Sequence, residues 1–374
     1  MFIPLPHGRG SVGALRHCDW PWRGRKESVA RLQRLIPVAL AVAIIPICRC
    51  DYSANSVPLF TGFRPIGYNL RWTVRARFRT RGLSMKIRKA VITAAGAQHA
   101  SLPLQTLVDR AGEVRTALRL TLDEVVAAGI EEIALVIRPG QRESYSTAAG
   151  SHASRLVFFE QTNPRGYGDA ILRATDFLGG ESFLHLVSDH LYLSRGDRLC
   201  AEQLVDAAVR HGCSVSAIQP TRENEIVHFG TVGGTPVPNE ARLYEVSTVV
   251  EKPTPTIAEQ RLIVAGQRAG HYLCLFGMHV LTPTVITILR EALNAAPAGG
   301  VIDLSSSLNR LASTERYLAL AVQGSRYNIS EKYGLLIAQL AFGLSGVDRE
   351  RILAELVQLL ASSQTPSAGG GRQS

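Results

Sequence analysis

The sequence lacks an apolar run long enough to cross a membrane as a helix. Its longest run, residues 35–47, is interrupted by Pro37 and Pro46, whereas a spanning helix needs about 20 apolar residues. The run also begins too late for an ordinary signal peptide. We therefore expect no membrane association and a cytoplasmic location, with a membrane-associating segment at 35–47 as the alternative.

Cysteine is scarce, and its number and spacing argue against a zinc site and against a disulfide framework. There are 6 cysteines in 374 residues, and no pair has the spacing of zinc ligands. Three of them, an odd number, fall in the regular part of the chain: Cys200, Cys213 and Cys274. This argues against a disulfide framework and favours free thiols in a reducing cytosol.

Acidic residues are nearly missing from the first 84 positions. Residues 1–84 hold 14 Lys and Arg but 3 Asp and Glu, and all 3 Trp, while the remainder holds 27 basic and 28 acidic residues. The net charge of +10 therefore does not describe the regular part, and we expect no nucleic-acid partner. Residues 1–84 have three interpretations: a translation start placed too far upstream of Met85, a disordered basic extension, or a membrane-associating segment.

From Lys89 onward, short apolar segments alternate with helical patterns, which is typical of an α/β protein with a parallel sheet. After Pro220 the pattern becomes richer in strands, which predicts a mixed extension. The expected strands are 90–93, 132–137, 155–159, 183–187, 213–218, 228–234, 243–250, 271–281 and 317–322. The expected helices are 115–128, 141–150, 201–211, 283–293, 304–311, 332–344 and 347–360.

Residues 161–193 combine a polar glycine loop, a helix, a buried strand and a carboxylate. Gly166 allows close approach of the backbone to a ligand, and Gly168 stands where a helix would begin, a place that attracts phosphates. Asp189 follows the apolar run 183–187, so it would emerge at the carboxyl end of a parallel strand. A carboxylate there can hold Mg²⁺ together with phosphate oxygens.

A second polar group follows the strand at 243–250. Glu251 can accept hydrogen bonds from hydroxyl groups, and Lys252 offers a point charge for a phosphate. The alternative is a surface ion pair before the turn at Pro253. Gly230 and Gly277 are candidates for close approach to a ligand, or else mark a turn or a bulge.

These segments resemble the sugar-nucleotide pyrophosphorylases, a nucleotidyltransferase family, and above all the bacterial UTP–glucose-1-phosphate uridylyltransferases. The family's base-binding segment, Gln-Gly-x-x-(Lys)-Gly-x-Gly-His-Ala, is matched in register, with Arg165 in place of Lys and Asp169 in place of His. The family's Val-Glu-Lys-Pro is present at 250–253. The resemblance covers about residues 86–345. The positions that match the base-binding segment directly are Gln161, Gly166, Gly168 and Ala170.

The resemblance implies a nucleotide-diphospho-sugar transferase fold, a Rossmann-like three-layer sandwich with a mixed sheet. It also implies transfer of a nucleotidyl group from a nucleoside triphosphate to a sugar 1-phosphate, with UTP and glucose 1-phosphate as substrates and Mg²⁺ as cofactor. The implied residues are Asp189 and Lys252 for catalysis; Ala95, Gly96, Gln161, Arg165 and Gly166 for the nucleotide; Gly230, Glu251 and Gly277 for the sugar; and Asp189 and Asn328 for the metal.

The chain departs from the family at its phosphate-binding residues. Gln98, His99 and Ala100 stand where the family has Gly, Thr and Arg, and Asn328 stands for its second metal carboxylate. A non-catalytic sugar-nucleotide-binding relative is therefore the alternative function. We expect a basic extension over 1–84, a nucleotidyltransferase domain over 85–361 and a disordered tail over 362–374, with a homo-oligomer as an open alternative.

Overall fold

The computed structural model describes residues 85–96 and 100–363. The predictions for residues 1–84, for Gln98 and His99, and for most of the tail lie outside these residues. The last described helix ends at Ser363, two residues into the predicted tail. The domain boundaries at Met85 and Ala361 stay predictions.

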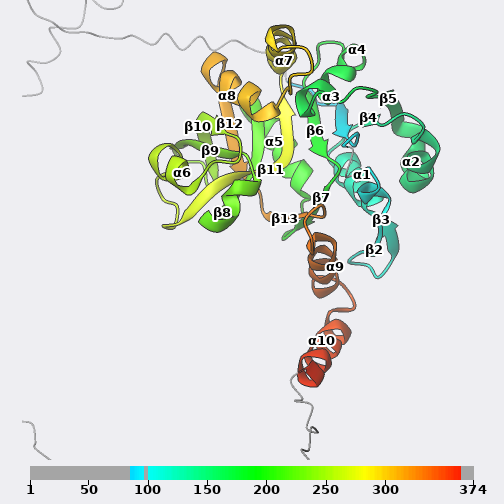
Figure 1. Cartoon of the computed structure of the whole chain (residues 1–374). Coiled ribbons are helices and arrows are strands. Elements are labelled where there is room, and N and C mark those ends of the chain that lie inside the picture. The colour runs from blue at the N-terminus through cyan, green and yellow to red at the C-terminus, as the bar shows by residue number, and fades with distance from the viewer. Residues whose placement is uncertain (1–84, 97–99, 364–374) are drawn as a thin grey trace, which may run out of the picture. The chain divides into compact units, whose positions relative to one another are not determined.

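A nine-stranded mixed sheet forms the centre of the described chain (Figure 1), in the order β5-β4-β1-β6-β11-β8-β12-β10-β9. The first four strands in this order are parallel to one another, and the long strand β11 then pairs antiparallel with both β6 and β8. The strands of this sheet are β1 (Lys89–Thr93), β4 (Glu132–Ile137), β5 (Leu156–Glu160), β6 (Phe183–Val187), β8 (Ser214–Arg222), β9 (Thr231–Pro236), β10 (Leu243–Val250), β11 (His271–Leu281) and β12 (Tyr317–Ala321).

Helices cover both faces of the sheet, which makes three layers. One face packs on α1, α2 and α5, and the other packs on α3, α4, α7 and α8. The predicted three-layer α/β sandwich with a mixed sheet is confirmed. The helices are α1 (Ala117–Ala127), α2 (Arg142–Ala149), α3 (Tyr167–Arg173), α4 (Thr175–Leu178), α5 (Cys200–His211), α6 (Pro255–Arg261), α7 (Thr284–Ala295), α8 (Leu304–Thr314), α9 (Gly334–Leu344) and α10 (Arg349–Ser363), with 3₁₀ turns at Leu102–Leu104, Gly150–Arg155 and Glu223–His228.

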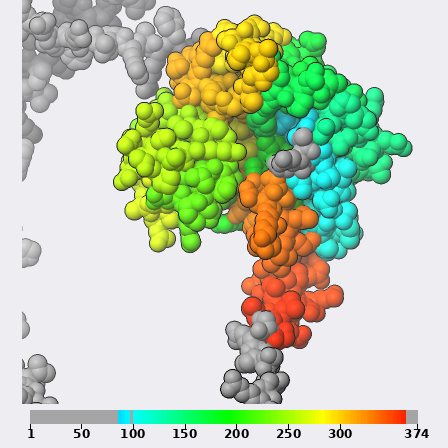
Figure 2. Space-filling view, in the orientation of Figure 1, coloured from blue at the N-terminus to red at the C-terminus, as the bar shows by residue number. Residues whose placement is uncertain are grey.

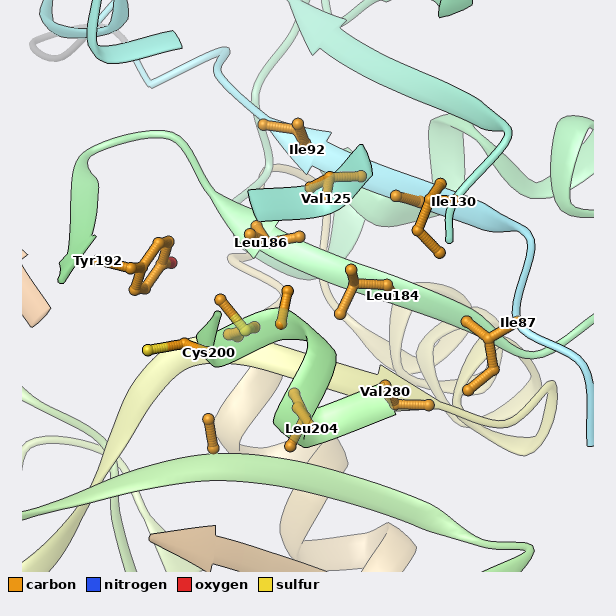
Figure 3. Close-up of a cluster of buried hydrophobic side chains, with 14 of the residues drawn as sticks. Ile87, Ile92, Val125, Ile130, Leu184, Leu186, Tyr192, Cys200, Leu204 and Val280 are labelled. Carbon is orange, nitrogen blue, oxygen red and sulfur yellow. The ribbon is translucent and has the colours of Figure 1, made fainter. Parts of the chain in front are cut away.

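The core on the α1–α5 face shows why the short apolar runs form central strands. Leu184 and Leu186 alternate along β6 and are fully buried against Leu204 of α5 and Val125 of α1 (Figure 3). Burying a leucine side chain contributes roughly 1.5–3 kcal/mol. The other face of β6 is buried as well, so the strand has the mostly apolar pattern of a covered parallel strand, with His185 as its one polar residue.

Two small sheets and one 3₁₀ turn differ from the sequence expectations. The hairpin β2 (Thr106–Val108) and β3 (Val114–Thr116) precedes α1, so the helix begins two residues later than predicted, capped by Thr116. A second two-stranded sheet joins β7 (His190–Ser194) to β13 (Gly324–Asn328). Residue 228, predicted to start a strand, ends the 3₁₀ turn, and β9 begins only at Thr231. These four short strands pair outside the central sheet, and most of them have polar residues where a central strand would be continuously apolar, so their pattern alone does not identify them.

Helix α9 packs against the β2 strand near the start of the described chain. Gln339 of α9 accepts a hydrogen bond from Val108 N at 2.8 Å and donates to Val108 O at 3.1 Å. Figure 2 shows these orange and cyan segments side by side. Strand β13 contacts both α9 and β7. The packing of α9 therefore also holds the end of β13 in place.

Three thiols in the regular part of the chain are free, as predicted. Cys200, Cys213 and Cys274 are buried and form no disulfide among the described residues. Within residues 85–96 and 100–363, no helix has both the length and the apolar character that a bilayer-crossing helix requires.

Candidate functional site

The carboxyl ends of β1 and β6 form the centre of the site. These two strands are parallel neighbours, and Ser188 N donates to Thr93 O at 3.2 Å just beyond their last pair. Asp189 therefore emerges at the edge of the sheet, with its side chain 25% exposed. This is the edge at which open α/β sheets bind ligands, as the sequence predicts.

Two cavities meet at this edge. The first, of about 260 Å³, lies between the β1 loop and the start of α3, and the second, of about 490 Å³, lies over β11 and the end of β10. Tyr167, Val187 and Asp189 line both. A wider surface hollow beneath α9 contains none of the predicted site residues.

The first cavity brings together most of the residues predicted to bind the nucleotide. Ala95, Gly96, Gln161 and Gly166 line it. Gly166 has a φ of +99°, and a Cβ there would lie 2.8 Å from Ile302 O, so this position requires glycine. Gln161 is 4% exposed and donates from Nε2 to Asp169 Oδ2 at 2.6 Å.

Arg165 is the exception among the predicted nucleotide residues. Its guanidinium donates to Gly300 O at 3.2 Å and to Pro297 O at 3.1 Å, and the side chain does not line the first cavity. In this structure Arg165 fastens its loop to the segment between α7 and α8. Its predicted contact with the nucleotide therefore gains no support from the geometry.

The second cavity holds all the residues predicted to bind the sugar. Gly230, Glu251, Lys252 and Gly277 line it. Ser305 Oγ donates to Glu251 Oε2 at 2.5 Å, which fixes one oxygen of this carboxylate beside Gly230. Lys252 has a φ of +45°, a conformation uncommon for a residue with a side chain and often found at functional sites.

Gly277 opens the second cavity by interrupting β11. The pairing of β11 with β8 shifts register between Leu275 and His279, and Gly277 has a φ of +80°. A Cβ at this position would lie 2.5 Å from His190 Nδ1 and 2.7 Å from Val187 Cγ2. The bulge thus brings the β11 backbone against the two residues that flank Asp189 in space.

We expect Gly277→Ala to destabilise the fold and to impair ligand binding in the second cavity. The cost should exceed that of Gly266→Ala by about 1–3 kcal/mol, the usual cost of overpacking. Gly266 is a matched control because its φ is +84° but nothing lies within 4 Å of its would-be Cβ. Urea unfolding of the two variants measures the difference, and equal losses would show that the close approach is unimportant.

A buried polar chain fixes the hydroxyl group of Tyr167, which lies between the cavities. His185 Nδ1 is 2.8 Å from Val91 O, a pure acceptor, so Nδ1 carries the proton and Nε2 accepts from Tyr167 Oη at 2.8 Å. Burial lowers the pKa of His185 to about 4, so the ring is neutral at pH 7. The Tyr167 oxygen is left as a hydrogen-bond acceptor at the junction.

Tyr167 and His190 are site residues that the sequence reasoning missed. Tyr167 lies inside the glycine-loop segment, and His190 directly follows Asp189, so adjacency to a predicted residue was the available signal. His190 lines the second cavity, and neither ring nitrogen has a hydrogen-bond partner among the described residues. Burial lowers its pKa to about 4.

The two predicted metal ligands receive different support from the structure. Asn328 Oδ1 already accepts from Ser330 N at 2.9 Å and from Ser330 Oγ at 2.6 Å, so its role as a ligand stays a prediction without support. Among the described residues, no cluster of three His, Cys, Asp or Glu could hold a metal by itself. Asp189 nevertheless fits Mg²⁺, which is commonly held by one or two carboxylates together with substrate phosphates.

Comparison with known proteins places this site in a family. Residues 107–325 match the family model described as nucleotidyl transferase. The chain belongs to this family. The match runs from the β2–β3 hairpin to β13 and so includes Gln161, Asp189 and Gly277.

Relatives and solved structures agree with this assignment. A UTP–glucose-1-phosphate uridylyltransferase of Streptococcus pneumoniae serotype 4 is 27% identical over 294 residues, which cover 70% of this chain and 92% of the relative. A UDP-glucose pyrophosphorylase structure complexed with UDP-glucose has a TM-score of 0.55 at 22% identity, covering 69% of this chain and 98% of that one. A UTP-bound structure from Acinetobacter baumannii has a TM-score of 0.57 at 22% identity, and the match covers 74% of this chain and 100% of that one. The structural likeness shows that this nucleotidyl transferase shares their fold.

Proposed function

We propose that this nucleotidyl transferase joins UTP to glucose 1-phosphate with the help of Mg²⁺, forming UDP-glucose and pyrophosphate. The observation that carries the proposal is the meeting of two cavities at Asp189. The first cavity is lined by the glycine loop and Gln161, and the second by Glu251 and Lys252. A nucleotide in one and a sugar phosphate in the other would place their phosphates at the shared edge. The substrates named in the relative at 27% identity also support this choice.

The residues present fit the roles that the reaction requires. Lys252 forms no ion pair among the described residues, so its ammonium can bind the sugar phosphate. Glu251 keeps one carboxylate oxygen beyond its bond to Ser305 for a sugar hydroxyl. An oxygen of the sugar phosphate attacks the α-phosphorus, and the bond to the oxygen bridging the β-phosphate breaks, so pyrophosphate leaves with that electron pair.

Mg²⁺ bound at Asp189 would neutralise phosphate charge, and alignment of the two substrates would supply much of the remaining acceleration. The chain itself holds the two phosphates at one edge and limits access of water through the walls of the two cavities. Tyr167, an acceptor at the junction, suits a ribose or sugar hydroxyl better than a phosphate oxygen, because two acceptors repel.

A non-catalytic sugar-nucleotide-binding protein is the second candidate, and two observations favour it. Ala100 replaces the arginine of the resembling enzymes, and its carbonyl is bonded to Tyr145 Oη at 2.8 Å in a buried position. Asn328 replaces a carboxylate, and its oxygen is bonded to Ser330. Both changes reduce the positive or metal-binding groups available to a triphosphate.

Pyrophosphate release separates the two candidates. The full chain is incubated with Mg²⁺, UTP and glucose 1-phosphate, with other nucleoside triphosphates and sugar 1-phosphates as comparison pairs. We expect release to be fastest with UTP and glucose 1-phosphate. Binding of UDP-glucose without release for any pair would establish the binding protein instead, and absence of both would reject the proposal.

A further inference from the structure

Asp169 holds the side chain of Gln161 in one orientation. Asp169 is 2% exposed, and its Oδ2 lies 2.6 Å from Gln161 Nε2. The same nitrogen lies 3.4 Å from Gly166 O. The two amide hydrogens of Gln161 are therefore both directed at protein acceptors.

The reversed amide is excluded by its neighbours. Turning the amide over would place Gln161 Oε1 against Asp169 Oδ2 and Gly166 O, where each atom accepts hydrogen bonds and none donates. Arg173 Nη2 donates to Asp169 Oδ1 at 3.1 Å, and Arg165 N to Asp169 Oδ2 at 3.4 Å. These donors hold the Asp169 carboxylate in place as an acceptor for the amide.

The polar atom that Gln161 keeps for a ligand is its carbonyl oxygen. Gln161 lines the first cavity, and its Oε1 forms no hydrogen bond within the described part of the chain. A free glutamine amide can both donate to and accept from a base. In the structure the donating half is occupied, so the side chain can only accept.

We propose that Asp169 and Arg173 are positioning residues that make Gln161 an acceptor, and that the site thereby selects a base whose ring nitrogen carries a hydrogen. Among pyrimidines this class contains uracil and thymine, whose N3 carries a hydrogen. It excludes cytosine, whose N3 carries a lone pair and no hydrogen. The inference rests on the proposed function, because it requires the nucleotide base to occupy the first cavity. The selection requires that N3 of the base faces Gln161. Cytosine in that position places its N3 lone pair against Oε1, and its N4 amino group reaches Oε1 only if the base shifts, so either arrangement costs affinity.

Binding of nucleoside diphosphates tests this without requiring turnover. Isothermal titration with UDP, CDP and 3-methyluridine diphosphate is run in the presence of Mg²⁺ on the wild-type chain. We expect UDP to bind about tenfold or more tightly than either of the other two, since an unpaired buried polar group is costly. The methylated probe needs no variant, so it remains informative if a substitution impairs folding.

Asp169→Asn tests the positioning role. Its amide can donate to Gln161 Oε1 as well as accept from Nε2, so both orientations of Gln161 become available and the UDP-to-CDP affinity ratio should fall about tenfold. Asp176→Asn, at an exposed carboxylate in α4, is the control and should leave the ratio unchanged. A purely structural role for Asp169 would weaken both nucleotides alike and preserve the ratio.

The outcomes separate the inference from the proposed function. If UDP, CDP and the methylated probe all fail to bind, the proposed function fails. If UDP binds but the other two bind equally well, or if the ratio survives Asp169→Asn, the positioning inference is wrong while the nucleotide site stands.

Discussion

Asp189→Asn should reduce pyrophosphate release by at least about 10²-fold, the usual scale for losing a group that stabilises charge in the transition state. Among the described residues, Asp189 is the one carboxylate that lines both cavities. Asparagine keeps its size but removes the negative charge that would hold Mg²⁺ between the substrates. Initial rates of pyrophosphate release at saturating UTP and glucose 1-phosphate measure the loss.

A matched control and a binding measurement complete this experiment. Asp197→Asn changes an exposed carboxylate beyond the other end of β7, so its rate should equal that of the wild type. UDP-glucose affinity should change little in Asp189→Asn, because the metal serves the reacting phosphates more than the product sugar. Undiminished pyrophosphate release in Asp189→Asn would remove this residue from the metal site.

Glu124→Gln should stabilise the fold at alkaline pH and leave it nearly unchanged at acid pH. Glu124 of α1 is 5% exposed and accepts from Ala201 N, at the start of α5, at 3.0 Å. Burial raises the pKa of its carboxyl from 4.5 to about 7, more than the bond to Ala201 lowers it. Between these values the folded carboxyl keeps a proton that the unfolded one has lost, so stability falls as pH rises through this range.

The expected loss of stability follows from the ordinary and the raised pKa of Glu124. The difference between a pKa of 4.5 and one of about 7 corresponds to about 3 kcal/mol in the free energy of unfolding. The wild type should lose this stability progressively as the pH rises, and the variant should not. Glutamine can still accept from Ala201 N, so the helix contact is retained. Urea unfolding at pH 5 and pH 8 measures the difference between the two proteins.

The effect of His185 on stability changes with pH in the opposite direction to that of Glu124, so the two effects have to be distinguished. Burial lowers its pKa to about 4, so its contribution is present above the ordinary histidine range and is lost as pH falls toward 4. It is common to both proteins, so it cancels in their difference. Glu131→Gln, at an exposed carboxylate, should show no such pH-dependent difference, and a flat difference for Glu124→Gln would contradict the assignment.

The sequence predicts the sheet well because its central strands are covered on both faces. The apolar run 183–187 became β6 with the same bounds, and the alternating run 271–281 became β11. The apolar pattern of a strand directly indicates which of its residues are buried. The hairpin β2–β3 and the pair β7–β13 escaped prediction because their stability comes from neighbours distant in sequence, such as Gln339 beneath Val108.

Strands fix the positions of two predicted residues, Asp189 just after β6 and Gly277 at the register shift within β11. Both residues line the second cavity. The Arg165 side chain instead follows the path of its loop toward Pro297, and the partner of Gln161 is set by the turn that begins α3. Side-chain direction in a loop depends on tertiary contacts, which residue type and spacing do not reveal.

The bond from Ile329 N to Asp189 O, at 2.9 Å, has a consequence for how the chain is made. Strand β6 lies between β1 and β11, and the loop after it is fastened by the segment following β13. During synthesis β6 therefore has an open edge until β11 leaves the ribosome, and the loop that carries Asp189 has no fastening until β13 follows. Such long-range pairing forms late and slowly. The edge that carries Asp189 is therefore completed only after β13 has been synthesised, later than every strand of the central sheet.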